Sequence, residues 1–141
     1  MGTGLLMMLV IAALIGRLSE YGERVLTLRD TLHRGLLERV PSVTLDGHPL
    51  ERLPNTLNLS FPGINAATLL AALRDRVACS TGSACHAGQA APSNVLLAMG
   101  RDAELASAAL RLSLGWNTTM QGVLQAATAI ADTIFTLRTE T

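Results

Sequence analysis

Cys85 is the residue of this sequence whose type and surroundings best suit nucleophilic chemistry. It lies in the segment 80–92, STGSACHAGQAAP, which is rich in glycine, serine and alanine and has no periodic apolar positions. Such a segment predicts a mobile loop at the protein surface. A thiol in exposed, polar surroundings ionises readily, and the thiolate is the reactive form of cysteine. The same pattern is also compatible with a cysteine that has no chemical role.

The second thiol and the neighbouring imidazole are weaker candidates. Cys79 follows Val77 and Ala78, an apolar setting that indicates a buried, inert cysteine. His86 could lower the pKa of the adjacent Cys85 thiol or move a proton, or it could be a solvated loop residue. Cys79, Cys85 and His86 could also begin a zinc site, but a structural site needs four ligands and no fourth is apparent. We therefore predict no metal site.

Arg111 is the candidate for binding a substrate carboxylate. In the segment 110–114 leucines alternate with polar residues, which predicts a strand with Arg111 on its polar face. A guanidinium group binds a carboxylate through two parallel hydrogen bonds, although an ordinary surface ion pair fits the same pattern. Asn55 and Asn58 are polar positions of an earlier strand and on their own are typical of turns or edges. Trp116 is expected to pack.

Short strands and helices surround these candidates. Residues 17–40 have apolar positions at alternating steps of three and four, which predicts an amphipathic helix that Pro41 ends. Apolar or alternating runs predict strands at Val43–Leu45, Thr56–Phe61, Val77–Cys79 and Leu110–Leu114. Further helices are predicted at Ala66–Arg74, at Asn94–Met99 and from Thr118, where Thr118 and Gln121 suit a capping box.

These elements predict a single α+β domain over residues 1–141. It consists of a small, mainly antiparallel sheet of three to four strands covered by helices, preceded by a long N-terminal helix. About half of the chain is hydrophobic, which allows a buried core. The formal net charge is zero, with 11 basic and 11 acidic residues, and this balance argues against a nucleic-acid-binding protein.

The segment Gly4–Gly16 is almost wholly apolar. It is shorter than the roughly 20 residues that span a bilayer, and no basic residue precedes it as in a signal peptide. We therefore predict a buried helix and no membrane association, with a membrane anchor or export signal as the alternative. Two cysteines six positions apart form no disulfide framework, and this favours the reducing cytoplasm.

Four stretches together resemble the class V aminotransferase family in its cysteine desulfurase branch. They occur in the family's order and are RLPNTLNLSF at 52–61, STGSAC at 80–85, PSNVLLAMG at 92–100 and LRLSLGWNTT at 110–119. The resemblance covers nearly the whole chain and is most specific between residues 52 and 119. It implies the C-terminal small domain of a pyridoxal-phosphate enzyme of fold type I.

The resemblance also implies a reaction and a role for several residues. These enzymes take sulfur from L-cysteine as a persulfide on a loop cysteine and release alanine, with pyridoxal phosphate as the electron sink. Cys85 matches the nucleophile, and Arg111 matches the arginine that binds the substrate carboxylate. Asn55 lies in a matching motif and is expected to bind substrate, and Thr3 matches a threonine that reaches the cofactor phosphate of a partner subunit. A homodimer and a sulfur-acceptor protein of iron–sulfur or thiolation pathways are implied as partners.

The basic residues set one condition on this interpretation. All 11 are arginine, so the chain offers no lysine for the Schiff base that holds pyridoxal phosphate. We therefore expect a fragment that lacks the cofactor-binding large domain, is inactive alone, and exposes apolar helix surface that favours association. A fragment of a selenocysteine lyase and a non-catalytic persulfide carrier or interaction module are the alternatives.

Overall fold

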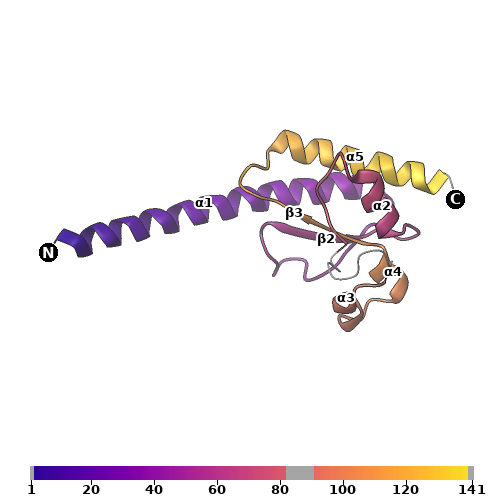
Figure 1. The fold of residues 1–141 in the computed structure, drawn as a ribbon, viewed down its shortest axis with the longest axis horizontal. Helices are drawn as coiled ribbons and strands as arrows, with labels where there is room; N and C mark the ends of the chain where they lie inside the picture. The colour runs from indigo at the N-terminus through magenta and orange to yellow at the C-terminus, as the bar shows by residue number, and fades with distance from the viewer. Residues whose placement is uncertain (1, 82–90, 140–141) are drawn as a thin grey trace.

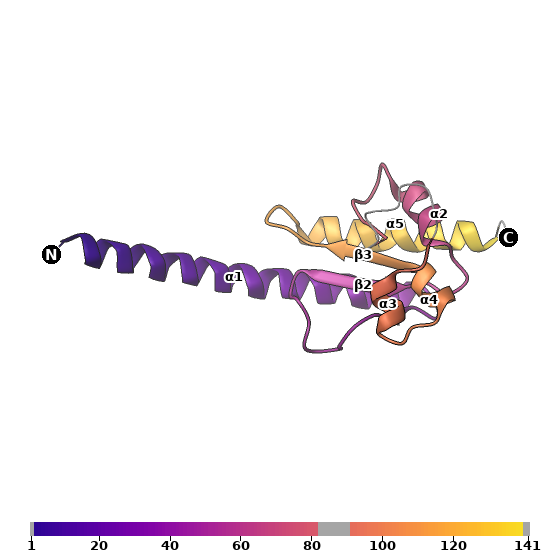
Figure 2. The same cartoon turned by 60° about the horizontal axis from the view of Figure 1, so that its bottom comes forward.

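The computed structural model describes the backbone of residues 2–81 and 91–139. A long helix, α1 (Gly2–Arg39), runs beside the last helix, α5 (Met120–Thr139), and a small sheet packs against this pair (Figures 1 and 2). The first half of α1 extends beyond the rest of the molecule (Figure 1). The prediction of an α+β fold with a long N-terminal helix is confirmed.

The sheet has three antiparallel strands in the order β1–β2–β3. They are β1 (Thr44–Leu45), β2 (Thr56–Ser60) and β3 (Ala109–Ser113). The leucines of β2 and β3 are buried, as their alternation predicted, and they join the core formed with α1 and α5. Hydrophobic burial on this one face therefore fixes which side chains of β2 and β3 point to the other face.

The contact between α1 and α5 is tight. Leu28, Leu32 and Leu36 of α1 and Ile130 of α5 belong to the same buried cluster. A Cβ atom placed on Gly35 would lie 3.3 Å from the Cβ of Ala127, closer than most packed side chains come. Small residues at this point thus let the two helices approach one another.

The first half of α1 corrects one prediction. Gly4–Gly16 was expected to form a buried helix, and the helix is present, but every described side chain from residue 7 to residue 20 is exposed. The large apolar side chains between Met7 and Leu18 are 47–71% exposed. The physical reason is length, since α1 has 38 residues and α5 only 20, or about 57 Å against about 30 Å. No helix in the described part of the chain is long and apolar enough to cross a membrane.

Two further predictions of secondary structure were wrong. Val77–Cys79 forms no strand, and the neighbouring Ser80 makes only an isolated bridge to Arg111. The helix α5 begins at Met120, and Thr119 rather than Thr118 caps it by accepting a hydrogen bond from the N–H of Gly122.

A short helix, α4 (Ala103–Ser107), was not predicted at all. It follows α3 (Asn94–Ala98), while α2 (Ala66–Leu73) lies close to its predicted position. Figure 1 shows α3 and α4 on the side of the sheet opposite to α1 and α5.

Candidate functional site

Arg111 lies in the middle of the polar face of the sheet. It is directly opposite Asn58 in the β2–β3 register, and Thr56 is paired with Ser113 beside them. Its side chain is exposed and makes no hydrogen bond or ion pair with any of the described residues. The surface ion pair that the sequence also allowed is therefore not seen there. A guanidinium group with free donors at this position can bind a carboxylate.

The segment that leads to Cys85 begins next to Arg111. The N–H of Arg111 donates to the Ser80 carbonyl at 2.6 Å, and the N–H of Ser80 donates to the Arg111 carbonyl at 3.0 Å. The other end is held where the N–H of Ser93 donates to the Ala106 carbonyl. Cys85 and His86 themselves lie outside the described residues.

A buried polar network holds α3 and α4 to the sheet. The carboxylate of Asp46 is fully buried and lies 3.0 Å from the Nε of Arg101 and 2.7 Å from the Oγ of Ser60. Burial raises the pKa of Asp46, although the bond from Ser60 and the charge of Arg101 act in the opposite direction. Arg101 also donates to the Leu45 carbonyl. Sequence reasoning missed this network, because the dipeptide Asp46-Gly47 is typical of a turn and gives no sign of an ion pair.

The other sequence candidates are not brought together with Arg111 by any described contact. The carbonyl of Asn55 accepts a hydrogen bond from the N–H of Leu114, and its side chain contacts Thr56. Thr3 lies in the first turn of α1, at the end of the helix far from the sheet (Figures 1 and 2). No described contact brings Thr3 to the polar face around Arg111, and its predicted role at a partner subunit stays a prediction.

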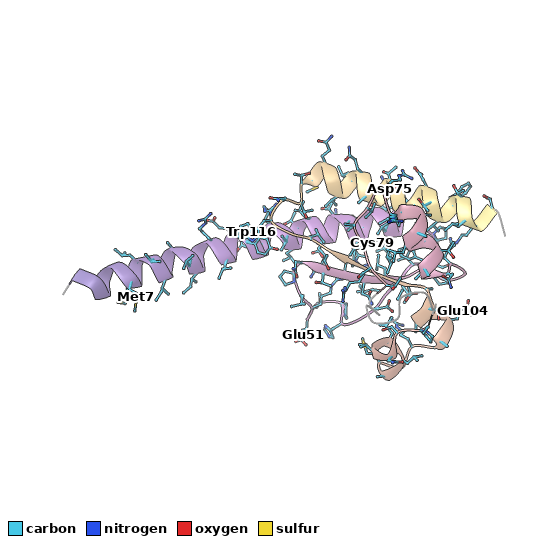
Figure 3. The ribbon with its side chains drawn as sticks, in the orientation of Figure 1. Met7, Glu51, Asp75, Cys79, Glu104 and Trp116 are labelled. Atoms are coloured by element: carbon cyan, nitrogen blue, oxygen red, sulfur yellow. The ribbon has the colours of Figure 1, made fainter. Side chains whose placement is uncertain are left out.

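Cys79 has the surroundings of an inert thiol. It is half-buried, packs against the core, and its Sγ donates weakly to the Val77 carbonyl. Burial raises the pKa of this thiol and so keeps it protonated near neutral pH. Figure 3 shows Cys79 within the folded body of the protein, between the sheet and α5. Among the described residues no group of three potential metal ligands occurs.

Trp116 fixes the turn that follows β3. Its ring stacks on Tyr21 of α1 with 4.2 Å between the ring centroids. Arg24 donates to the carbonyls of Trp116 and Thr118 at 2.7 and 2.8 Å. Figure 3 shows Trp116 where α1 leaves the body of the fold. Trp116 therefore packs, as predicted, but on the surface, and it ties the end of β3 to α1.

The order of these motifs matches one family. The model of the family Aminotransferase class-V matches residues 5–125, which include most of α1, the whole sheet and the start of α5. The chain belongs to the class V aminotransferase family. The cysteine desulfurase IscS of Methanosarcina thermophila is 38% identical over 122 residues, covering 86% of this chain and 30% of that protein. The cysteine desulfurase of Sinorhizobium fredii is 45% identical over 93 residues, covering 64% of this chain and 24% of that protein.

Solved structures agree with this assignment. A NifS-like protein matches the fold with a TM-score of 0.72 and 29% identity, over 87% of this chain and 30% of the other. A NifS-like protein from Rickettsia africae matches with a TM-score of 0.67, over 82% of this chain and 29% of the other. At 23% identity this match shows the fold alone. This class V aminotransferase chain thus spans less than a third of the length of these relatives.

The family's cofactor, pyridoxal phosphate, does not fit the residues of this chain by themselves. Covalent binding needs a lysine amine, and all basic residues here are arginine. The described polar face offers Arg111 and amide and hydroxyl groups, which can bind a carboxylate but cannot form an imine. What this face can do chemically is orient an anionic substrate.

Proposed function

We propose that this chain is the C-terminal small domain of a cysteine desulfurase, in which Arg111 binds the carboxylate of L-cysteine and Cys85 takes its sulfur as a persulfide. The observation that carries the proposal is the pairing of Ser80 with Arg111. It anchors the segment with the reactive thiol beside the residue that would hold the substrate.

Chain connectivity supports this arrangement. Cys85 follows Ser80 by five residues, and an extended chain spans at most about 3.6 Å per residue, so the two Cα atoms are within about 18 Å of one another. That reach includes a substrate bound at Arg111 as well as an acceptor at the surface. A carrier of sulfur needs both positions.

The transfer step balances without an added oxidant. The Cys85 thiolate attacks the sulfur of L-cysteine, so an S–S bond forms while the C–S bond breaks. The carbon keeps the electron pair of that bond and takes a proton, which leaves alanine. The sulfur is oxidised to the same extent as the carbon is reduced. Pyridoxal phosphate supplies the electron sink in this family, and it would have to be held by a domain outside this chain.

The same proposal includes partners and location. The complete enzyme would be a cytoplasmic homodimer that passes sulfur to an acceptor protein for iron–sulfur cluster assembly or thiolation. The names of the IscS relatives support the cysteine desulfurase activity itself. The isolated chain would be inactive, because it has no lysine to hold the cofactor.

The test uses a chimaera in which this chain replaces the matching segment of the M. thermophila relative. We expect Cys85→Ser to lower alanine release by about 100-fold or more and to abolish persulfide on the protein, because the nucleophile is lost. Cys79→Ser is the matched control and should leave both unchanged. Equal losses in the two variants, or a cofactor-loaded chimaera that releases no alanine, would contradict the proposal.

A second candidate function is a persulfide carrier without catalysis, and the absence of lysine favours it. The same chimaera separates the two, because a carrier gains sulfur only when a separate desulfurase supplies it. Offering selenocysteine beside cysteine in the assay tests the selenocysteine lyase alternative.

A further inference from the structure

A cavity of about 580 Å³ lies between α1 and the turn that precedes β2. Its charged lining is unbalanced, since three arginines and one histidine face a single carboxylate. The lining includes Arg29, Asp30, His33, Arg34 and Arg52. None of these residues belongs to the polar face around Arg111, so a binding site in this cavity is independent of the proposed desulfurase function.

Asp30 lies near two of the arginines but accepts hydrogen bonds from only one of them, Arg29. Arg29 is 4% exposed and bonded at each of its three nitrogens, with its Nε and Nη2 on the Oδ1 of Asp30 at 3.0 and 2.7 Å and its Nη1 on the Leu53 carbonyl. Arg52 is 14% exposed, and its Nη2 lies 3.7 Å from the same Asp30 oxygen. Its Nε and Nη1 are buried without a hydrogen-bond partner. Buried donors are normally paired, so Arg52 lacks an acceptor.

The surroundings of His33 also hold more positive charge than negative charge. Burial lowers the pKa of His33, and the neighbouring Arg52 and Arg29 lower it further against the pull of Asp30. Its Nε2 is also buried and unpartnered. Burial and the charge of Arg29 lower the pKa of Arg52 as well. Excess positive charge in one cavity is relieved by an anion.

The rest of the cavity is apolar. Leu26 and Leu37 of α1 line it eleven residues apart, or about 16 Å along the helix, and both are partly exposed. Leu50, on the opposite wall, is 83% exposed. An occupant with an apolar body would remove these side chains from water.

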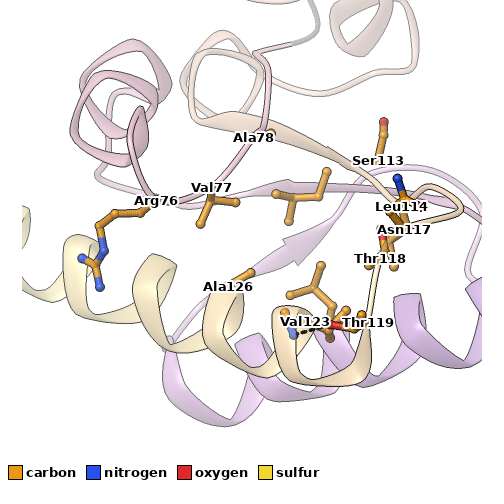
Figure 4. Close-up of a pocket in the computed structure, with 13 residues that line it drawn as sticks. Arg76, Val77, Ala78, Ser113, Leu114, Asn117, Thr118, Thr119, Val123 and Ala126 are labelled. Carbon is orange, nitrogen blue, oxygen red and sulfur yellow. Dashed lines mark hydrogen bonds between the residues drawn. The ribbon is translucent and has the colours of Figure 1, made fainter.

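We propose that this cavity binds an oxyanion, a carboxylate or a phosphate group, carried on an apolar body, with Arg52 as its main ligand and Arg34 and His33 beside it. The Nε and Nη1 of Arg52 are covered in this structure, so binding through them would require a change of its side-chain rotamer. Another cavity, of about 290 Å³ between β3 and α5, is lined by no buried donor that lacks a hydrogen-bond partner among the described residues (Figure 4). Arg76 is its one charged lining residue, and Leu112, Leu114 and Val123 are among its apolar lining residues.

The test measures binding of inorganic phosphate and of hexanoate to the 141-residue chain at constant ionic strength. The readouts are the thermal unfolding midpoint and the NMR signal of His33, assigned with His33→Gln. We expect saturable binding of at least one probe and a rise in the His33 pKa. Arg52→Met should weaken binding at least tenfold and Arg34→Gln several-fold. Arg17→Gln removes an exposed charge from the same helix and should change nothing.

Phosphate binding alone would assign the site to phosphate groups, and preference for hexanoate would assign it to carboxylates on an apolar body. Without an anion, Arg52→Met should keep or raise the unfolding midpoint, because it removes donors that have no partner. A midpoint lowered by several degrees would mean that Arg52 is structural, and the proposal would fail. It would also fail if neither probe bound saturably, or if Arg17→Gln weakened binding as much as Arg52→Met. None of these outcomes bears on the Cys85 chemistry.

Discussion

At the scale of single residues, the strand β3 fixes the backbone of Arg111, while no described residue bonds to its side chain. Its backbone N–H and carbonyl are used by Ser80, and Asn58 faces it across the ladder. Its side chain has no partner among the described residues, so none of them competes with a carboxylate for its donors. This combination of a fixed backbone and a free guanidinium group suits a binding residue.

Arg111→Gln should therefore weaken the binding of L-cysteine in the chimaera. Loss of two charge-assisted hydrogen bonds corresponds to about 3 kcal/mol, or roughly a 100-fold rise in KM. Arg111→Lys keeps the charge but loses the fork and should recover only part of the affinity. The measurement is alanine release at varied cysteine concentration, with Arg74→Gln as an exposed control. A KM that is unchanged in Arg111→Gln would remove this residue from the substrate site.

At the scale of elements, sequence patterns predicted the strands and helices whose buried faces show a regular apolar repeat. The alternating leucines of β2 and β3 determined the strands, their inward face and the outward position of Arg111, because a strand repeats every two residues. The five residues of α4 are too few to show an apolar period, and its N-cap, Asp102, was not recognised in the sequence. The Asp46–Arg101 ion pair joins residues 55 positions apart, and no local pattern contains that information.

Removing this ion pair should loosen α3 and α4 from the sheet. Arg101→Gln leaves the buried Asp46 carboxylate without its cation and should lower the free energy of unfolding by about 2 kcal/mol, given that Arg101 is partly exposed. Burial raises the pKa of Asp46, and losing Arg101 raises it further. The ionised form is the one that Arg101 stabilises. The loss should therefore be largest at neutral pH and shrink as Asp46 is protonated.

Urea unfolding of Arg101→Gln and of the unchanged chain at several pH values measures this difference. Arg74→Gln, which removes an exposed charge, should show neither the loss nor its pH dependence. A loss that stays constant through the titration of Asp46 would mean that the bond from Arg101 to the Leu45 carbonyl carries the whole effect.

At the scale of the whole molecule, the two halves of α1 differ in how far they are buried. The second half of α1 packs on α5 and the sheet, while the first half carries apolar side chains into solvent, as Met7 shows in Figure 3. The family match begins at residue 5 and so includes this exposed half. The apolar run in the sequence indicated burial, but the described part of the chain does not cover the first half of α1, because α1 is longer than α5.

Exposed apolar surface of this extent should make the isolated chain associate. Leu14→Glu places a charge in the middle of the exposed run and should lower the association constant about tenfold or more, since a buried carboxylate is costly at an apolar contact. Val95→Glu adds the same charge at an exposed apolar position on α3 and is the matched control. Sedimentation at several concentrations measures both. If the two variants associate equally, the first half of α1 is not the surface through which copies of the chain meet.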